Sequence, residues 1–391
     1  MLQRRSQALV LCVSISFSIS ELWSLHSPKA LVMGAEQCQE LVQNWSTGTL
    51  PPRPDQDWIL RQLKLQGYPW THNASALGQY REQLGGCCNA SADLVLTQNN
   101  TQNGSQIVYD GEPAKKYLVD EKLLEMLPQV SPFQDAPYNS CAVVGGGGIL
   151  QNSSCGPEID RAQFVIRINP PWGFPPMNFS DDVGNKSNIV TMNPSVLRDR
   201  FGSLINQHRH FAEVVGAYGA PLLLIPAFSF AGDSNVSFQA LYILKNFSSP
   251  VRTFFMNPKY LAGLDGHWRC RGLCAKRLSS GFMLLNAALE LCQHLTLYGF
   301  WPFPTDPEGR PLPYHYYDKQ TPKPGVHTMN DEFTRYLGMH LQGALRLHLG
   351  RCQEGPAGGR AQQGSEGGGS EMSPPAPQFH LTPSPGTKGG K

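Results

Sequence analysis

Short apolar runs recur along the middle of the chain and alternate with segments that are long enough to form helices. These runs occupy residues 142–144, 164–168, 188–192, 221–226, 251–256 and 295–300. Each is rich in β-branched or aromatic residues and is flanked by polar or turn-forming residues, which predicts buried strands. Their alternation with helical segments predicts an α/β fold in which the sheet is mostly parallel.

Four consecutive glycines, Gly145 to Gly148, follow the first of these runs. Residues without a Cβ let backbone amides close on a phosphate, so this turn is a candidate nucleotide site. We expect a helix over residues 149–160 after the turn. Asn169 ends the next strand, where ligands of open α/β sheets bind.

Glycine-rich turns also occur for packing reasons alone, so this turn is a weak signal by itself. The run is GGGG and not GxGxxG, and no acidic residue ends a following strand about 20 residues later. The pattern therefore argues against a nucleotide-dependent oxidoreductase.

A second candidate site begins at Ser279, Ser280 and Gly281, just before an apolar helical run that continues to residue 295. The start of a helix offers free amide donors and the positive end of the helix dipole. An ordinary serine N-cap would give the same sequence pattern.

Length, charge and glycosylation sequons restrict the class of protein. The 391 residues suit one domain of roughly 250 to 300 residues with appendages. A net charge of +2 provides no polyanion-binding surface, so no nucleic-acid partner is expected. Ten cysteines and many N-x-Ser/Thr sequons indicate the oxidising secretory pathway. The sequons are at Asn44, Asn73, Asn89, Asn99, Asn103, Asn152, Asn178, Asn185, Asn235 and Asn246.

The two ends of the chain differ from its centre. Arg4 and Arg5 precede an uncharged run over residues 6–20, which suits either a cleaved signal peptide or a short membrane anchor. Residues 26–57 are polar and rich in proline, as in a stem, and we interpret the D-x-D at Asp55 as a chance match within it. Residues 353–391 are dominated by Gly, Pro, Ser and Gln, which predicts a disordered tail.

Four segments resemble the motifs of animal sialyltransferases, and most closely those of the α2,8 branch. CAVVGGGGIL, CGPEID and FVIRIN, within residues 141–169, resemble the large sialylmotif. RLSSG and LYGFWPF, within residues 277–303, resemble the small motif. HYYD at residues 315–318 resembles the third motif, and HTMNDE at residues 327–332 the very small motif. The resemblance covers about residues 58–352 and leaves out the stem and the tail.

The resemblance implies a GT-A-like variant fold with a Rossmann-like, mostly parallel sheet in a single catalytic domain. It implies transfer of sialic acid from CMP-sialic acid with inversion, without a metal or other cofactor. His327 would be the base that takes the acceptor proton, and His315 would contact the departing phosphate. Imidazole suits both tasks because its ordinary pKa is near 6.5. Further donor contacts carry over to Gly146, Asn169, Ser279, Ser280, Gly281 and Trp301.

Several details depend on the same resemblance. Disulfides are implied between Cys141 and Cys292 and between Cys155 and Cys352. Cys270 and Cys274 have no counterpart, and could pair with each other or form an intermolecular bond. Glu332 could orient its helix or His327, or be an ordinary residue of a first helical turn. Two positions depart from the pattern: Gly146 replaces an asparagine that binds the donor, and Ile168 replaces a cysteine.

The resemblance also favours an anchor over a signal peptide, with a cytoplasmic tail over residues 1–7, a signal anchor over 8–25 and a lumenal domain over 58–352. The expected place is the Golgi membrane, in type II orientation. The expected acceptor is a sialylated glycolipid or glycoprotein, with short-chain, ganglioside-type enzymes most similar, and a homo- or heterodimer is possible. The alternative is a weak or inactive member that binds active sialyltransferases, for which Gly146 is the only support.

Overall fold

The computed structural model describes residues 70–173, 176–273, 275–318 and 329–352. The expected cytoplasmic tail, anchor, stem and carboxyl-terminal tail lie outside these residues, as do His327 and Cys274, so their assignments stay predictions. None of the described helices is both long enough and apolar enough to cross a membrane.

A seven-stranded sheet forms the centre of the fold, and every neighbouring pair of its strands is parallel. Its order is β7-β6-β5-β4-β3-β8-β9. The strands are β3 (Tyr138–Val144), β4 (Phe164–Arg167), β5 (Ile189–Thr191), β6 (Leu222–Ile225), β7 (Arg252–Phe255), β8 (Cys292–Tyr298) and β9 (Arg346–His348). The chain moves outward from β3 to β7 and then returns to the other side of β3. Strand order therefore reverses between β3 and β8, which is where such sheets bind ligands.

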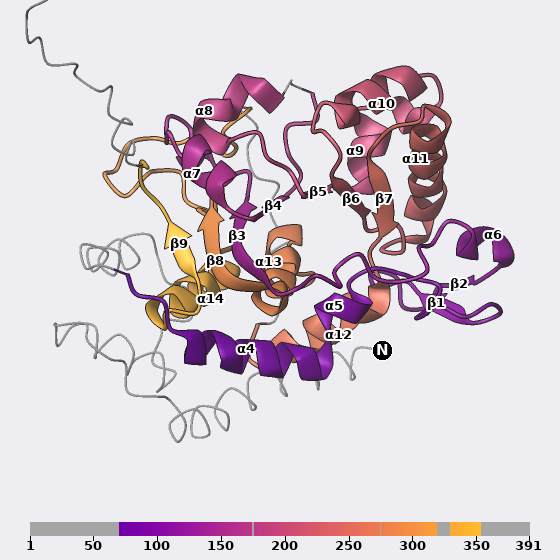
Figure 1. Ribbon diagram of the computed structural model, residues 1–391, viewed down its shortest axis with the longest axis horizontal. Coiled ribbons are helices and arrows are strands. Elements are labelled where there is room, and N and C mark those ends of the chain that lie inside the picture. The colour runs from indigo at the N-terminus through magenta and orange to yellow at the C-terminus, as the bar shows by residue number, and fades with distance from the viewer. Residues whose placement is uncertain (1–69, 174–175, 274, 319–328, 353–391) are drawn as a thin grey trace, which may run out of the picture. The chain divides into compact units, whose positions relative to one another are not determined.

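Helices cover both faces of this sheet, as Figure 1 shows. Successive residues of β3 point to opposite faces: Cys141 and Val143 join one core, whereas Ala142 and Val144 join another. The first face carries α4 (Ala74–Cys87), α5 (Ala90–Asp93), α12 (Pro258–Arg269), α13 (Ser280–Leu291) and α14 (Met329–Leu341). The second carries α7 (Gly156–Arg161), α8 (Ser180–Val183), α9 (Pro194–Asp199), α10 (His208–Gly216) and α11 (Ser234–Asn246). The predicted α/β architecture is confirmed.

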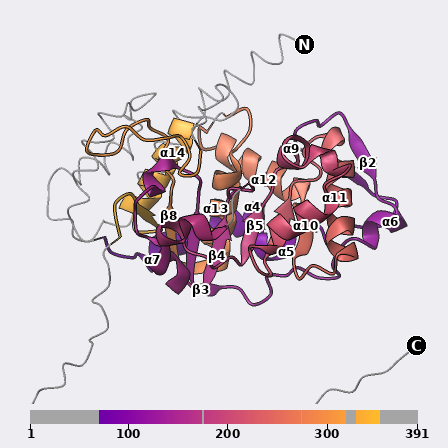
Figure 2. The same cartoon turned by 90° about the horizontal axis from the view of Figure 1, so that it is seen from above.

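A small hairpin lies beside α11, where Figure 2 shows it from above. It consists of β1 (Gln106–Val108) and β2 (Lys116–Leu118), followed by α6 (Glu121–Leu124). Its Tyr117 ring meets Phe228 edge-on, and the nearby Asp110 forms an ion pair with Arg277 at 2.9 Å. Burial raises the pKa of Asp110, and the adjacent guanidinium opposes that shift. The ion pair ties this region to the segment that leads into α13.

The helix predicted over residues 149–160 is wrong. A single 3₁₀ turn, η2 (Gly148–Leu150), follows the glycines, and α7 begins only at Gly156. Between them Asn152 and Ser154 adopt left-handed conformations, with φ of 60° and 56°, which a continuous helix cannot contain. The glycine turn therefore has no long helix, and no strong helix dipole, behind it.

Two long-range disulfides cross the sheet region. Cys141 is bonded to Cys292, which joins β3 to β8, and Cys155 is bonded to Cys352, 197 residues away. The sequence did not predict a third bond, between the adjacent Cys87 and Cys88. Cys270 is exposed and has a free thiol.

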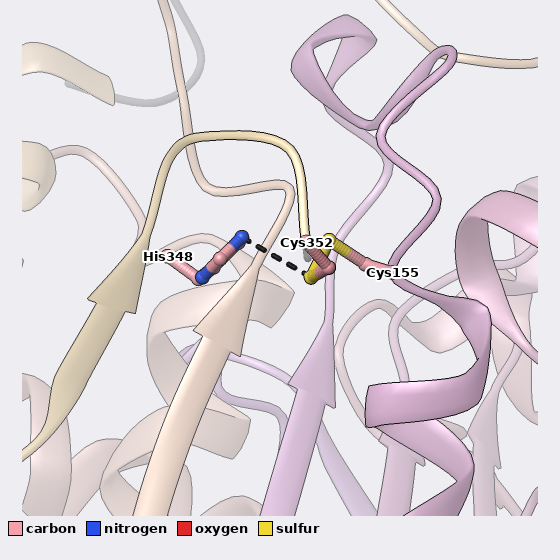
Figure 3. Close-up of side chains that lie close together, drawn as sticks. All are labelled: Cys155, His348 and Cys352. Carbon is pink, nitrogen blue, oxygen red and sulfur yellow. Dashed lines mark hydrogen bonds between the residues drawn. A yellow bond between two sulfur atoms is a disulfide. The ribbon is translucent and has the colours of Figure 1, made fainter. Parts of the chain in front are cut away.

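Figure 3 shows His348 beside the second long-range bond, with Nε2 3.2 Å from the Cys352 sulfur. Cys155, His348 and Cys352 would have the donor atoms of a metal site if both sulfurs were thiolates. Because the sulfurs are bonded to each other, the structure has a disulfide with a neighbouring imidazole here.

Nine of the sequon asparagines lie among the described residues, and eight of them are exposed: Asn89, Asn99, Asn103, Asn152, Asn178, Asn185, Asn235 and Asn246. Asn73 is half-buried, and its side-chain oxygen caps α4 by accepting a hydrogen bond from the Ala76 amide. Asn44 lies outside the described residues. Which sequons carry glycans stays a prediction.

Candidate active site

The predicted donor-binding residues lie where the central strands end. Gly146 follows β3 and Asn169 follows β4. Asn169 has a left-handed backbone, with φ of 43°, and its amide donates to Thr191 Oγ1 at 2.9 Å. Asparagine tolerates this conformation better than most residues, and such strain is common at functional sites.

The glycine turn is held by the fold itself. The amides of Gly145, Gly147 and Gly148 donate to the carbonyls of Tyr298, Gly299 and Tyr314, at 2.8, 3.0 and 3.2 Å. The Gly146 amide is the one in this turn that forms no hydrogen bond with a described residue. We expected several amides of this turn to bind a phosphate, and among them only the Gly146 amide remains available.

Close packing explains why three of the four positions are glycine. A Cβ on Gly145 would lie 2.9 Å from the Gly299 carbonyl oxygen, and a Cβ on Gly147 would overlap the same oxygen. A Cβ on Gly148 would overlap the carbonyl oxygen of Pro313. Gly146 differs, because its Cβ would have only side chains as nearest neighbours.

His315 lies directly over the turn. Its backbone forms a β-bridge with Gly147, and the amide of the next residue donates to the Gly146 carbonyl at 3.1 Å. The imidazole stacks on Tyr317 with centroids 4.9 Å apart, and its Nδ1 lies 3.0 Å from the Asp318 carboxylate. Since that carboxylate accepts from Nδ1–H, Nε2 remains for a ligand, and an imidazolium would donate from it. This geometry suits contact with a phosphate.

The start of α13 supplies the second group of predicted contacts. Ser279 is the N-cap, and its hydroxyl oxygen accepts from the Phe282 amide at 3.1 Å. Its hydroxyl and amide donate to the two carboxylate oxygens of Glu332, at 2.5 and 2.8 Å. Ser279 is buried, so it shapes the site without offering these donors to a ligand. Ser280 and Gly281 are half-buried in the first turn, where amides lack helical partners.

Glu332 is a buried carboxyl group that joins the very small motif to the small motif. It lies in the first turn of α14, with no exposed surface, and Tyr336 also donates to it at 3.4 Å. Burial raises the pKa of Glu332 to about 7, against the opposing effect of the hydrogen bonds from Ser279. This contact holds the first turn of α14 next to the start of α13. Of the roles considered for Glu332, the structure supports orientation of its helix.

Trp301 is largely enclosed by the protein. Its indole N–H donates to the Thr305 carbonyl at 2.7 Å, and its ring packs edge-on against Phe303 and Phe333. Only 6% of the residue is exposed. Trp301 therefore forms part of the wall near the site, and its indole N–H is not free for a donor nucleotide.

Sequence reasoning missed Asn193. It lies two residues after the end of β5, and its side-chain oxygen is 3.4 Å from Ser280 Oγ. A usable signal was present, because Asn193 follows a predicted strand in the same way as Asn169. The ends of β3, β4 and β5 and the start of α13 thus carry polar groups to one edge of the sheet.

Comparison with known proteins identifies the family. Residues 95–344 match the model of glycosyltransferase family 29 (sialyltransferase). The chain is 38% identical over 322 residues to mouse alpha-2,8-sialyltransferase 8F, covering 81% of this chain and 80% of that protein. It is 40% identical over 294 residues to human alpha-2,8-sialyltransferase 8E, covering 75% and 77% of the two chains.

Among solved structures, a mammalian sialyltransferase in complex with Gal-beta-1-3GalNAc-ortho-nitrophenol is 20% identical, with a TM-score of 0.41. The alignment covers 76% of this chain and 87% of that one. The family match and the relatives above, each covering most of both chains, are sufficient for an assignment. This chain belongs to glycosyltransferase family 29, the sialyltransferases.

Proposed function

We propose that this protein transfers sialic acid from CMP-sialic acid, with inversion, to a terminal sialic acid, forming an α2,8 linkage. The observation that carries the proposal is the convergence of the motif segments at one sheet edge. The bridge between Gly147 and His315 joins the large and third motifs, and the contact between Ser279 and Glu332 joins the small and very small motifs. The names of the relatives, alpha-2,8-sialyltransferases, support the linkage.

In the proposed reaction His327 takes the proton of the acceptor hydroxyl as its oxygen attacks the anomeric carbon of the donor. The bond from that carbon to the phosphate oxygen breaks, and CMP leaves with the bonding electrons. His315, and the free amides at the start of α13, would stabilise the phosphate as its negative charge grows. This arrangement requires neither a metal nor another cofactor.

The acceptor would be a sialylated glycolipid or glycoprotein. We further propose that the chain works in the Golgi lumen, held as a type II membrane protein by residues 8–25. Disulfides and exposed sequons among the described residues support a secretory location. A homo- or heterodimer is compatible with this arrangement.

A panel of acceptors tests the proposal. The purified lumenal region would be incubated with CMP-sialic acid and with sialylated lipids, sialylated glycoproteins and their desialylated counterparts. Transfer to sialylated acceptors, and not to their desialylated counterparts, is expected. Folded protein that transfers to none of them would contradict the proposal.

A non-catalytic role is the second candidate, and Gly146 is the observation that favours it. The side chain that the family places there is missing, and three of the four turn amides are unavailable to a phosphate. If the panel shows no transfer, co-purification with active sialyltransferases would support this second function.

A further inference from the structure

Arg200 follows α9 directly, and its guanidinium reaches the loop that continues from Asn169. It lies on the backbone of Gly173, where a Cβ would be only 2.6 Å from Arg200 Nη1. A side chain at position 173 would displace the guanidinium, because a Cβ does not approach another heavy atom to 2.6 Å. Glycine here thus makes room for the arginine.

The charge of this guanidinium also acts on Tyr317. Burial and the neighbouring Asp318 carboxylate raise the pKa of Tyr317 to about 12, and the positive charge of Arg200 acts in the opposite direction. Tyr317 in turn stacks on His315, and its ring lies 3.7 Å from the position of a Cβ on Gly146. The charge of Arg200 therefore acts on a ring that lies at the candidate site.

The charge of Arg200 is not neutralised within the described part of the chain. Arg198, on the same helix, forms an ion pair with Asp233, and Arg277 forms one with Asp110. Arg200 forms no ion pair with any described residue, and its side chain is exposed. An exposed positive charge near a binding site, without an anion among the described residues, is suited to an anionic ligand.

The proposed acceptor supplies such an anion. A terminal sialic acid carries its carboxylate on the same sugar as the 8-hydroxyl that would attack the donor, and the carboxylate is ionised at neutral pH. A guanidinium matches a carboxylate with two parallel hydrogen bonds, which gives both affinity and orientation.

We propose that Arg200 binds the carboxylate of the acceptor's terminal sialic acid and so selects sialylated acceptors. This inference rests on the proposed function. Arg200 is then a specificity-determining residue beside the groups that face the donor, and Gly173 is the residue that lets it lie there.

Binding measurements that need no turnover test the inference. Sialyllactose and its methyl ester would be titrated, in the presence of CMP, into the parent, Arg200→Gln and the control Arg209→Gln, which removes an exposed charge from α10. The parent and Arg209→Gln should bind the acid at least about tenfold more tightly than the ester, the effect of a charged hydrogen bond. Arg200→Gln should bind the two alike. Gly173→Ala, which keeps the charge but displaces it, should reduce the preference.

Three results would overturn the assignment. They are an undiminished preference for the acid in Arg200→Gln, equal or absent binding of acid and ester by the parent, and a loss of CMP affinity in Arg200→Gln. The last result would place Arg200 at the donor. Failure of the proposed function would look different, because CMP-sialic acid would then not be consumed with any acceptor, whatever Arg200 binds.

Discussion

Gly146 lies so close to His315 that a Cβ on the glycine would be 3.2 Å from Cδ2 of the imidazole. Such a contact is tight, so the ring would have to shift by a few tenths of an ångström to admit the Cβ. An asparagine here, as in the resembled motif, would therefore contact the histidine that we assign to the phosphate. With glycine at this position, the contact of an asparagine side chain with the donor and its contact with His315 are both absent.

Gly146→Asn should raise kcat/KM for CMP-sialic acid. A hydrogen bond from the asparagine amide to the bound CMP-sialic acid contributes about 1 to 3 kcal/mol. This corresponds to an increase in kcat/KM of roughly 5- to 150-fold. Gly146→Ala is the control, because it adds the Cβ without the amide and should bring no gain. Equal effects of the two variants would show that the amide is dispensable. An inactive parent that Gly146→Asn restores would support the non-catalytic reading of the native chain.

Gly148→Ala should unfold or strongly destabilise the protein, whereas Gly146→Ala should not. The Cβ on residue 148 would overlap a backbone oxygen, and overpacking against backbone costs about 3 kcal/mol or more. Thermal unfolding of the two variants, measured side by side, checks this difference. Equal melting temperatures would mean that the turn is looser than the structure shows.

The glycine turn also shows how far sequence reasoning reaches. The strand before it and Asn169 beyond it were predicted because apolar runs with flanking polar residues are local signals. The helix over residues 149–160 was predicted wrongly, because the left-handed residues Asn152 and Ser154 interrupt it and neither is a glycine. Strand β9 has one leucine between Arg346 and His348, so it forms no apolar run and was not predicted.

Contacts between distant residues could not be predicted from sequence patterns. Ser279 and Glu332 are separated by 53 residues, and no local signal indicates that the serine binds the carboxylate. The family resemblance named both segments, but it assigned Ser279 to the donor. The structure instead places its hydroxyl and amide on Glu332.

Glu332 should make stability fall as pH rises from about 4.5 to about 7. Its carboxyl has an ordinary pKa of 4.5 and a pKa of about 7 in the fold, so the folded state binds the proton more tightly. The stabilisation from this shift is complete below pH 4.5 and is lost once the pH exceeds about 7. It amounts to at most about 3 kcal/mol. Glu332→Gln keeps one acceptor for Ser279 but cannot titrate.

Thermal unfolding of the parent and Glu332→Gln across this pH range measures the effect. The parent should lose stability relative to the variant as pH rises. Parallel curves would show that Glu332 is already ionised throughout the range.

Non-reducing peptide mapping should find Cys141 bonded to Cys292 and Cys155 bonded to Cys352. In the entropic model each bond stabilises by about 5 kcal/mol, because it closes a loop of more than a hundred residues in the unfolded chain. Replacing both Cys155 and Cys352 by serine should therefore lower the melting temperature. A free Cys141, or a bond from Cys141 to Cys270, would contradict this arrangement.

The two histidines should have separable roles, and steady-state kinetics with CMP-sialic acid and a sialylated acceptor measures this most directly. His327→Ala should lower kcat by about 10²- to 10⁴-fold, the contribution of a general base, with little change in the affinity for CMP. His315→Ala should also weaken binding of the donor, because its partner is the donor phosphate. Undiminished turnover by folded His327→Ala would contradict the proposed mechanism.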